Sequence, residues 1–291
     1  MNQSVNFLMS GDAHAPYLVV ALRSLRQHYW GKVVVWAYPE SLVTIQQISL
    51  DSDLSIIVKE WQPVYRGKNG QFYNKQFMMS QLTDPFNLYL DADVMVAGPL
   101  DPLFAMVRSS GFVATQFNTW KSNEGVVRKR ILNLADKVND SWKSCVKVAS
   151  EESLPSVNGG VFGCTPRSTA LSMWKGLTEQ VLDTFIADEV ALHLIVADYQ
   201  ERGSNFFKVA EGGMWNCSPK YQPASLKDTD VKIWHFHGDS NVRPQKSAKG
   251  YELWWKAFEE CRAANAGKIN DWLLGVLHQN RFLKELVDAS R

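Results

Sequence analysis

Residues 86–93 have the sequence Phe-Asn-Leu-Tyr-Leu-Asp-Ala-Asp, an apolar run that ends in two alternating carboxylates. The run Phe86–Leu90 predicts a buried β-strand, and Asp91 and Asp93 follow it directly. Ligands of open parallel sheets bind outside the carboxyl ends of the strands, which is where these side chains are expected. Because alternate residues of an extended chain project to the same side, both carboxylates can reach one cation. Their hard oxygen atoms suit Mg²⁺ or Mn²⁺.

Asp-x-Asp is a weak signal alone, because a chain of this length contains it about once by chance. Asp51 with Asp53 and Asp228 with Asp230 repeat the pattern, but each pair precedes a predicted strand. We therefore expect these two pairs at the opposite edge of the sheet, as solvated turn residues. The pair after residue 90 has two other interpretations, a capped turn or the nucleophile motif of haloacid-dehalogenase-type phosphatases. Those phosphatases carry the motif after their first strand, which disfavours the second interpretation.

Strands alternate with helices on both sides of this motif. In the first half, strands are predicted at 5–9, 33–38 and 54–61 and helices at 17–28, 42–48 and 71–81. In the second half, strands are predicted at 112–116, 156–162 and 231–236 and helices at 187–198, 251–264 and 269–287. This alternation is typical of a doubly wound, mostly parallel sheet with both faces covered. We predict one mixed α/β domain with a helical carboxyl-terminal appendage.

The composition excludes several classes of protein. The chain has 291 residues, 45% of them hydrophobic, and a net charge of +1. It can form a sizeable core and is neither disordered, collagen-like nor disulfide-stapled. The balanced charge argues against nucleic-acid binding. The opening segment lacks the layout of a secretory signal, no apolar run approaches the roughly 20 residues of a membrane span, and the cysteines form no CxxC pair. We expect a soluble cytoplasmic protein with reduced thiols.

Tryptophan is unusually frequent, with 11 residues against 9 tyrosines. This excess suits a bulky core or a surface that binds flat, partly apolar ligands such as sugars. Core positions are expected for Trp30, Trp36, Trp61, Trp174 and Trp234, and acceptor-side positions for Trp120, Trp142 and Trp215. Trp254, Trp255 and Trp272 belong to the last predicted helices, which we expect to pack on the domain, with peripheral membrane contact as the alternative.

Four sequence blocks span residues 5 to about 245: Gly11-Asp12-Ala13-His14 with Ala21-Leu22-Arg23-Ser24-Leu25, Tyr73-Asn74-Lys75 ahead of residues 88–94, Val157-Asn158-Gly159-Gly160-Val161-Phe162, and Trp234-His235-Phe236-His237-Gly238. With these blocks in this order, the chain resembles the GT-A-fold glycosyltransferases, especially the glycogenin-like and galactosyltransferase members of glycosyltransferase family 8. The resemblance implies a Rossmann-like GT-A catalytic domain over 1–245, with a nucleotide-binding half at 1–95, an acceptor-side half at 96–245 and a helical extension at 246–291.

The resemblance implies a metal-dependent transferase of a nucleotide sugar, with UDP-glucose or UDP-galactose as the expected donor and Mn²⁺ or Mg²⁺ as the cofactor. Asp91, Asp93 and His235 would be the metal ligands, with His237 as an alternative to His235. The implied donor-binding residues are Gly11, Asp12, His14, Lys75, Asp91, Ala92, Asn158, Gly159, Gly160, His237, Gly238 and Arg243. Without the resemblance, Lys75 would be interpreted as an exposed helix lysine and His235 as a structural histidine.

Asp188, Glu189 and Lys75 are the implied catalytic residues. Asp188 and Glu189 open a predicted helix and match the position of the family's Asp-Gln pair. A carboxylate there can bind sugar hydroxyls, stabilise positive charge at the anomeric carbon or attack it. Carboxylates also favour the first turn of a helix for capping and dipole reasons. Retention of configuration is implied, although an adjacent Asp-Glu pair can also supply the general base of an inverting enzyme.

The acceptor is expected to be a glycan, a lipid-linked sugar or a protein. By analogy with this fold, acceptor specificity is assigned to the charged stretch 118–155, which none of the four blocks includes. The non-catalytic alternative is a protein that binds carbohydrate or nucleotide on a transferase fold. Neither a nucleic-acid partner nor an oligomeric state is predicted.

Overall fold

The computed structural model describes residues 2–67, 70–236 and 248–264. Its strands are β1 Gln3–Met9, β2 Lys32–Ala37, β3 Ile57–Glu60, β4 Phe86–Leu90, β5 Val94–Val96, β6 Phe112–Lys121, β7 Pro155–Cys164, β8 Lys208–Ala210 and β9 Ile233–His235. Its helices are α1 Ala15–Arg26, α2 Leu42–Ser49, α3 Gly70–Ser80, α4 Asp101–Ser110, α5 Gly125–Leu132, α6 Lys143–Glu151, α7 Thr169–Gln180, α8 Ala187–Arg202 and α9 Ala248–Ala264.

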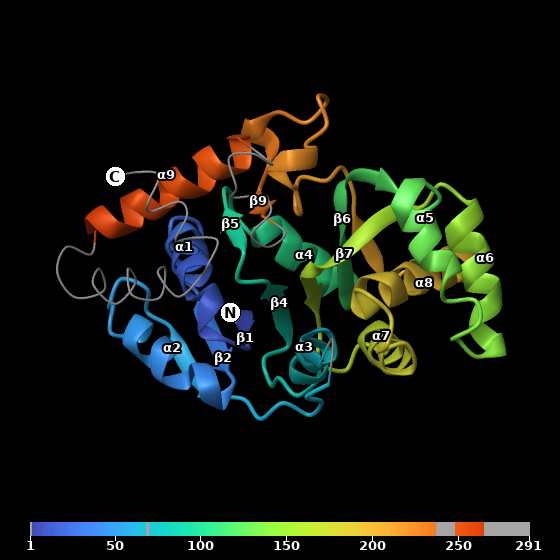
Figure 1. Ribbon diagram of the computed structural model, residues 1–291, viewed down its shortest axis with the longest axis horizontal. Coiled ribbons are helices and arrows are strands. Elements are labelled where there is room, and N and C mark those ends of the chain that lie inside the picture. The colour runs from blue at the N-terminus through green and yellow to red at the C-terminus, as the bar shows by residue number, and fades with distance from the viewer. Residues whose placement is uncertain (1, 68–69, 237–247, 265–291) are drawn as a thin grey trace. The chain divides into compact units, whose positions relative to one another are not determined.

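A seven-stranded sheet has the strand order β3-β2-β1-β4-β7-β6-β8, and β5 pairs with β9 in a second, two-stranded sheet. The pairs β2–β3 and β6–β8 are parallel, whereas β6–β7 and β5–β9 are antiparallel. Helices flank the sheet strands, as the ribbon shows (Figure 1). This mixed, mostly parallel arrangement confirms the predicted α/β fold class.

The chain divides into two compact units, each assembled from separate segments. Unit 1 comprises Met1–Ser4, Pro63–Tyr89 and Asp101–Asn216. Unit 2 comprises Val5–Gln62, Leu90–Leu100 and the chain from Cys217 onward. The predicted domain halves at 1–95 and 96–245 stay a prediction.

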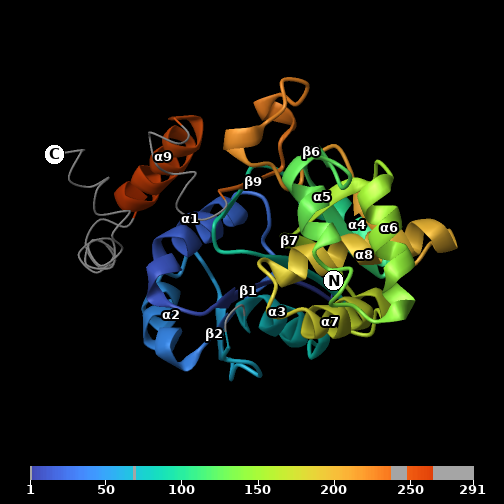
Figure 2. The same cartoon turned by 45° about the vertical axis from the view of Figure 1, so that its right-hand side comes forward.

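In unit 2, α1 packs against β5 and α9. The hydroxyl of Ser24 on α1 accepts the N–H of Val96 on β5 at 3.0 Å. On α9, the Trp254 ring lies 5.1 Å from the Tyr17 ring of α1 and 5.0 Å from the Phe258 ring. Helix α9 therefore runs along α1 (Figures 1 and 2), and Trp254 is buried, as expected for a packing residue.

In unit 1, aromatic rings pack around β6 and β7. Phe162 on β7 stacks on Phe112 of β6 at 6.0 Å and meets the edge of the Trp174 ring at 4.9 Å. Trp174 belongs to α7, and its indole N–H donates to the backbone carbonyl of Asp188 on α8 at 2.7 Å. The buried tryptophan therefore ties the start of α8 to the core of the unit.

Three positions differ from the sequence predictions. Trp30 is 78% exposed, because it lies in the turn between α1 and β2 rather than under a helix. Trp215, predicted on the acceptor side, is 4% exposed and belongs to the core. Asp51 is not a solvated turn residue, because its side chain is 6% exposed and pairs with Arg23. Asp53 is 73% exposed, as predicted.

Helices α4 to α7 were not predicted as separate elements. The predicted helix at 269–287, with Trp272, lies outside the described residues. Within the described ranges, no helix combines the length and apolar character that crossing a membrane requires. All four cysteines are buried, and none of them forms a disulfide.

Candidate active site

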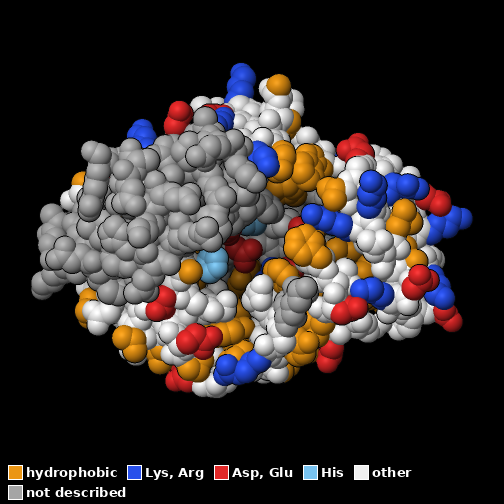
Figure 3. Space-filling model, viewed as in Figure 1, with side chains coloured by type: hydrophobic (Ala, Val, Ile, Leu, Met, Phe, Trp, Pro, Cys, Tyr) orange, Lys and Arg blue, Asp and Glu red, His pale blue; other side chains and the backbone are white. Residues whose placement is uncertain are grey.

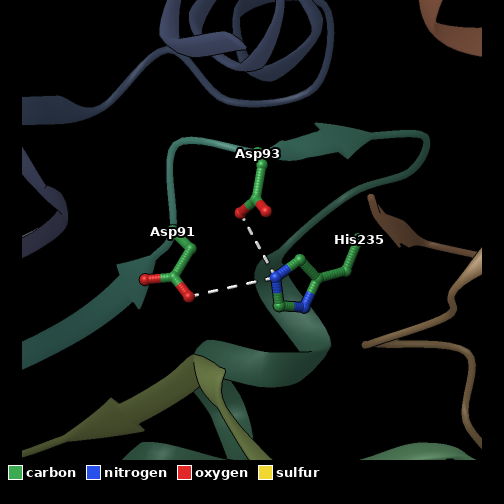
Figure 4. Close-up of side chains that lie close together, drawn as sticks. All are labelled: Asp91, Asp93 and His235. Carbon is green, nitrogen blue, oxygen red and sulfur yellow. Dashed lines mark ion pairs between the residues drawn. The ribbon is translucent and has the colours of Figure 1, made fainter. Parts of the chain in front are cut away.

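Two aspartates and a histidine meet in unit 2. Asp91 and Asp93 lie in the turn between β4 and β5, and His235 is the last residue of β9. The antiparallel pairing of β5 with β9 places Val94 opposite His235. The N–H of Phe236 donates to the backbone carbonyl of Asp93 at 2.8 Å. Backbone pairing thus holds the imidazole beside the two carboxylates (Figure 4).

The geometry of these three side chains fits a divalent cation. His235 Nε2 lies 3.3 Å from Asp93 Oδ1 and 3.9 Å from Asp91 Oδ2, and one ligand atom from each residue lies within 4.8 Å of the others. The histidine is buried, whereas the side chains of Asp91 and Asp93 are 32% and 16% exposed. Two carboxylate oxygens and an imidazole nitrogen suit Mn²⁺ or Mg²⁺, whose remaining positions are usually filled by water or phosphate oxygens.

The first sequence block forms a short 3₁₀ turn at Asp12–His14, ahead of α1. Asp12 Oδ1 is buried and makes no hydrogen bond within the part of the chain that the structure describes. Because buried carboxylate oxygens are normally hydrogen-bonded, a donor group of a ligand would satisfy this atom. A Cβ added at Gly11 would contact no atom within 4 Å, and His14 is exposed. This turn therefore leaves room for a ligand.

A second group of charged residues lies in unit 1. Lys75 on α3 forms an ion pair with Asp188 on α8, with Nζ 2.5 Å from Oδ2 and each side chain 5% exposed. Lys75 is therefore not an exposed helix lysine. The Nζ atom also lies 5.6 Å from the centre of the Tyr89 ring. Such a buried pair depends on both partners, because removal of either charge leaves the other desolvated.

Gly159 on β7 lies directly against this ion pair. A Cβ at this position would come within 2.6 Å of Asp188 Oδ2, 3.0 Å of Lys75 Nζ and 3.2 Å of the Trp174 ring. Real Cβ atoms do not approach a carboxylate oxygen so closely, so a larger residue requires the pair to move. The glycine predicted to line the donor sugar thus also makes room for the buried ion pair.

Glu189, the next residue on α8, is held by two donors. The amide of Asn158 donates to Oε2 at 2.8 Å, and Arg130 Nη1 lies 3.3 Å from Oε1. Burial raises the pKa of Glu189 to about 7, while Arg130 and the Asn158 hydrogen bond oppose that rise. A carboxyl group with such a pKa exchanges its proton near neutral pH, which suits it to acid–base or charge-stabilising roles.

His193 connects the first turns of α8 to β7. Its Nε2 accepts the N–H of Val157 at 3.2 Å and lies 3.1 Å from the Ser156 hydroxyl. Since Nε2 is an acceptor, the proton of the neutral ring is on Nδ1, which donates to the Glu189 carbonyl at 2.7 Å. Burial lowers the pKa of His193 to about 4, so the ring is neutral. His193 is a structural support for the helix turn that carries Glu189.

Asn158 is fixed from its other side. Its Oδ1 accepts the backbone N–H of Gly160 at 2.8 Å and the side-chain amide of Asn216 at 3.5 Å. Asn216 also donates to the Thr115 hydroxyl at 3.0 Å. Because Oδ1 is an acceptor, the amide nitrogen of Asn158 is directed at Glu189.

The structure brings some of the predicted site residues together and divides the whole set between the two units. Asp91, Asp93 and His235 form one cluster in unit 2, which also contains Ala92, Gly11, Asp12 and His14. Unit 1 contains Lys75, Asn158, Gly159, Gly160, Asp188 and Glu189, which are linked by the contacts described above. His237, Gly238 and Arg243 lie outside the described residues.

Sequence reasoning missed Arg130, His193 and Asn216. His193 follows Glu189 by four residues on the same helix, a spacing that places both on one face and could have indicated the contact. Arg130 lies in the basic run Arg128-Lys129-Arg130, which gives no sign of its partner. Asn216 is brought in by a contact of long sequence range, since it lies 58 positions after Asn158.

Comparison with solved structures identifies the fold. The galactosyltransferase LgtC, solved in complex with donor and acceptor sugar analogs, has 17% sequence identity and a TM-score of 0.60 over 88% of this chain and 95% of LgtC. The active-site mutant Q189E of LgtC gives a TM-score of 0.61 with the same identity and coverage. Mouse xyloside xylosyltransferase 1 has 14% identity and a TM-score of 0.56 over 81% of this chain and 98% of that protein.

These likenesses show the GT-A fold of glycosyltransferases, as the sequence resemblance implied. The bifunctional glycosyltransferase WbbM has the same fold over 88% of this chain and 49% of WbbM, with a TM-score of 0.59 and 10% identity. No family model matches the sequence, and no curated protein matches it.

Proposed function

We propose that this chain is a metal-dependent glycosyltransferase that moves a hexose from a UDP-sugar to an acceptor hydroxyl. The observation that carries the proposal is the grouping of Asp91, Asp93 and His235 after a buried strand of a GT-A fold. The structurally similar LgtC is a galactosyltransferase solved with donor and acceptor sugar analogs, which supports a sugar nucleotide as donor and a sugar as acceptor.

In the proposed reaction, the bond between the anomeric carbon and a diphosphate oxygen breaks, and its electron pair leaves with the diphosphate. The acceptor hydroxyl oxygen forms the new bond to the anomeric carbon and releases its proton. A divalent cation bound by Asp91, Asp93 and His235 would stabilise the negative charge that develops on the leaving group. Asp12 would bind the nucleotide through its buried Oδ1.

The residues of unit 1 are assigned to the sugar. Lys75 would contact the diphosphate or the donor sugar while it stays paired with Asp188. Asn158 and Gly159 would line the sugar. The Glu189 carboxylate would stabilise the positive charge that grows at the anomeric carbon, the role of a carboxylate in oxocarbenium-like transition states. We assign retention of configuration and a glycan or glycolipid acceptor on the basis of the family resemblance.

The metal assignment is tested by ligand-dependent thermal stability. UDP with Mn²⁺ should raise the melting temperature of the wild-type protein, and UDP without metal should raise it less. Asp93→Ala should abolish the metal-dependent increment, because a ligand stabilises only the state that binds it. Asp230→Ala is the matched control, since it removes an exposed aspartate of another Asp-x-Asp pair. An unchanged increment in Asp93→Ala would refute the metal site.

Catalysis is tested by a screen of nucleotide sugars for metal-dependent donor hydrolysis. UDP-glucose or UDP-galactose should be hydrolysed slowly, releasing UDP, and Asp93→Ala should lose this activity. Binding of UDP without turnover of any nucleotide sugar, with or without glycan acceptors, would instead favour the non-catalytic binding protein.

A further inference from the structure

Arg130 belongs to α5 and to none of the motif blocks, yet its guanidinium reaches the start of α8. Nη1 lies 3.3 Å from Glu189 Oε1, and Cζ lies 5.4 Å from the centre of the Phe185 ring. Phe185 immediately precedes Ile186, the N-cap residue of α8, which has a left-handed φ of 50°. Helices α5, α6 and α8 lie side by side in Figures 1 and 2 and contact one another. Arg130 therefore contacts both sides of the turn that begins α8.

Glu189 needs such a partner if it is to be charged. Its side chain is 15% exposed, so water does little to stabilise a negative charge there. The charged groups that act on it are Arg130 from α5, Lys75 from α3 and its own neighbour Asp188 on α8, while Asn158 from β7 donates a hydrogen bond. Asp188 repels a charge on Glu189, and Lys75 is already paired with Asp188. Arg130 is the cation in direct contact with the Glu189 carboxylate.

We propose that Arg130 is a positioning residue, which holds the Glu189 carboxylate in its charged form and in one orientation for the sugar-transfer reaction. The catalytic consequence rests on the proposed function, whereas the effect of Arg130 on the charge and orientation of the Glu189 carboxylate does not. The guanidinium and the Asn158 amide each engage a different oxygen of the carboxylate, which fixes the plane of the group. The Phe185 ring supports the guanidinium from outside, at a site where Phe185 is itself 66% exposed.

A purely structural role for Arg130 would give a different result from a positioning role. An arginine that only joined α5 to α8 would change stability, while the proton affinity of Glu189 would stay the same. An arginine that holds the carboxylate in its charged form must change that proton affinity when it is removed. The two cases separate in a measurement of the Glu189 titration.

Three variants test the proposal. Arg130→Gln removes the charge and keeps a shorter polar side chain, and Arg130→Lys keeps the charge without the planar fork. Lys129→Gln is the matched control, because it removes an exposed positive charge from the same helix. Lysine and arginine side chains gather on the surface over α5 and α6 (Figure 3). This control therefore tests whether the positive electrostatic potential of that surface, and not the contact with Arg130, acts on Glu189.

The direct readout is the titration of Glu189 by NMR in protein labelled with ¹³C at the glutamate carboxyl, with Glu189→Gln to identify the signal. Arg130→Gln should move the Glu189 midpoint upward by about one pH unit or more. Arg130→Lys should move it less, and Lys129→Gln should leave it at the wild-type value. A wild-type Glu189 midpoint in folded Arg130→Gln would overturn the proposal. If that variant does not fold, a wild-type Glu189 midpoint in Arg130→Lys would overturn it.

The second readout is the pH profile of donor hydrolysis. Arg130→Gln should shift the acid limb of kcat toward higher pH, recover activity above the new midpoint and leave the KM for the donor within twofold. Equal loss of kcat at every pH would contradict the positioning role. A wild-type protein that hydrolyses no nucleotide sugar would refute the proposed function, whereas the NMR titration would still decide the role of Arg130.

Discussion

The Lys75 ammonium lies 2.5 Å from the Asp188 carboxylate, and both side chains are almost fully shielded from water. The two residues come from α3 and α8, so the pair joins helices that are more than a hundred positions apart in the sequence. Because little water surrounds the pair, each charge is stabilised mainly by the other, and removal of one would leave the other without compensation.

Replacement of Lys75 by methionine should therefore lower the free energy of unfolding by about 3 to 5 kcal/mol, because Asp188 loses the cation that it contacts in the interior. Urea denaturation measures the change. The double variant Lys75→Met/Asp188→Asn should be more stable than Lys75→Met alone. As a control, Lys137→Met removes a partly exposed lysine that pairs with the exposed Asp183, and should cost less than about 1 kcal/mol. Equal losses in the two lysine variants would contradict the importance of burial.

Substitution of Gly159 by alanine tests the close packing against the same pair. The added methyl group would approach Asp188 Oδ2 to 2.6 Å, so we expect a loss of about 1 to 3 kcal/mol. Gly176→Ala is the control, because a Cβ at this position on α7 would contact no atom within 4 Å. That variant should be more stable than wild type by about 0.5 to 1 kcal/mol. If Gly159→Ala were as stable as wild type, the contact with the ion pair would not be tight.

The raised pKa of Glu189 should appear in the pH dependence of stability. The folded protein binds the Glu189 proton with a pKa of about 7, against 4.5 for an ordinary glutamate. The folded state therefore holds more protons than the unfolded state between these values, and stability should fall as pH rises through this window. The total loss is about 3 kcal/mol.

Denaturation of Glu189→Gln at several pH values isolates this contribution. The variant should gain stability relative to wild type as pH rises from about 4.5 to 7. Glu124→Gln removes an exposed carboxylate of the same unit and should follow the wild-type curve. A constant difference between Glu189→Gln and wild type across this range would show that burial does not raise the Glu189 pKa.

The buried thiols should resist chemical modification in the native protein. Burial raises the pKa of Cys217 and Cys261 to about 12 and raises the pKa of Cys145 and Cys164 as well. Because the thiolate is the reactive form, an aromatic disulfide reagent at pH 8 should label the folded protein slowly and all four thiols once urea unfolds it. Absorbance of the released thiol measures the rate.

A cysteine introduced at an exposed position provides the reference for this experiment. Ser109→Cys, at the exposed end of α4, should react rapidly in the folded protein. Labelling of a native cysteine at the same rate would indicate that the thiol is accessible from solvent.

The local elements of the fold were largely predictable. The strand Phe86–Leu90 begins and ends where the sequence predicts it, because four of its five residues are hydrophobic and two carboxylates follow directly. Helices α1, α3 and α8 also lie within a few residues of their predicted ranges, since apolar residues recur along them at helical spacing. Helix α7 carries Leu171, Trp174 and Leu177 at the same spacing, although no helix was predicted there.

The site was predictable to the extent that it follows from motifs. The grouping of Asp91 and Asp93 with His235 was expected from the order of the blocks, and the three side chains do lie together; metal binding by them stays a prediction. The pairing of Arg130 with Glu189 and of Arg23 with Asp51 could not be predicted, because each depends on how two elements pack rather than on either sequence. Trp30 is exposed for a similar reason, since hydrophobicity alone does not say which turns are covered.

The pairing of Val94 with His235 has a consequence for synthesis of the chain. The ribosome makes Asp91 and Asp93 long before it makes β9, and in the meantime it completes nearly all of unit 1, from Asp101 to Asn216. The three-residue cluster thus cannot form until His235 has been synthesised. A nascent polypeptide that ends between residues 93 and 234 holds two of these side chains without the third, so the cluster is complete only after most of the sheet has been translated.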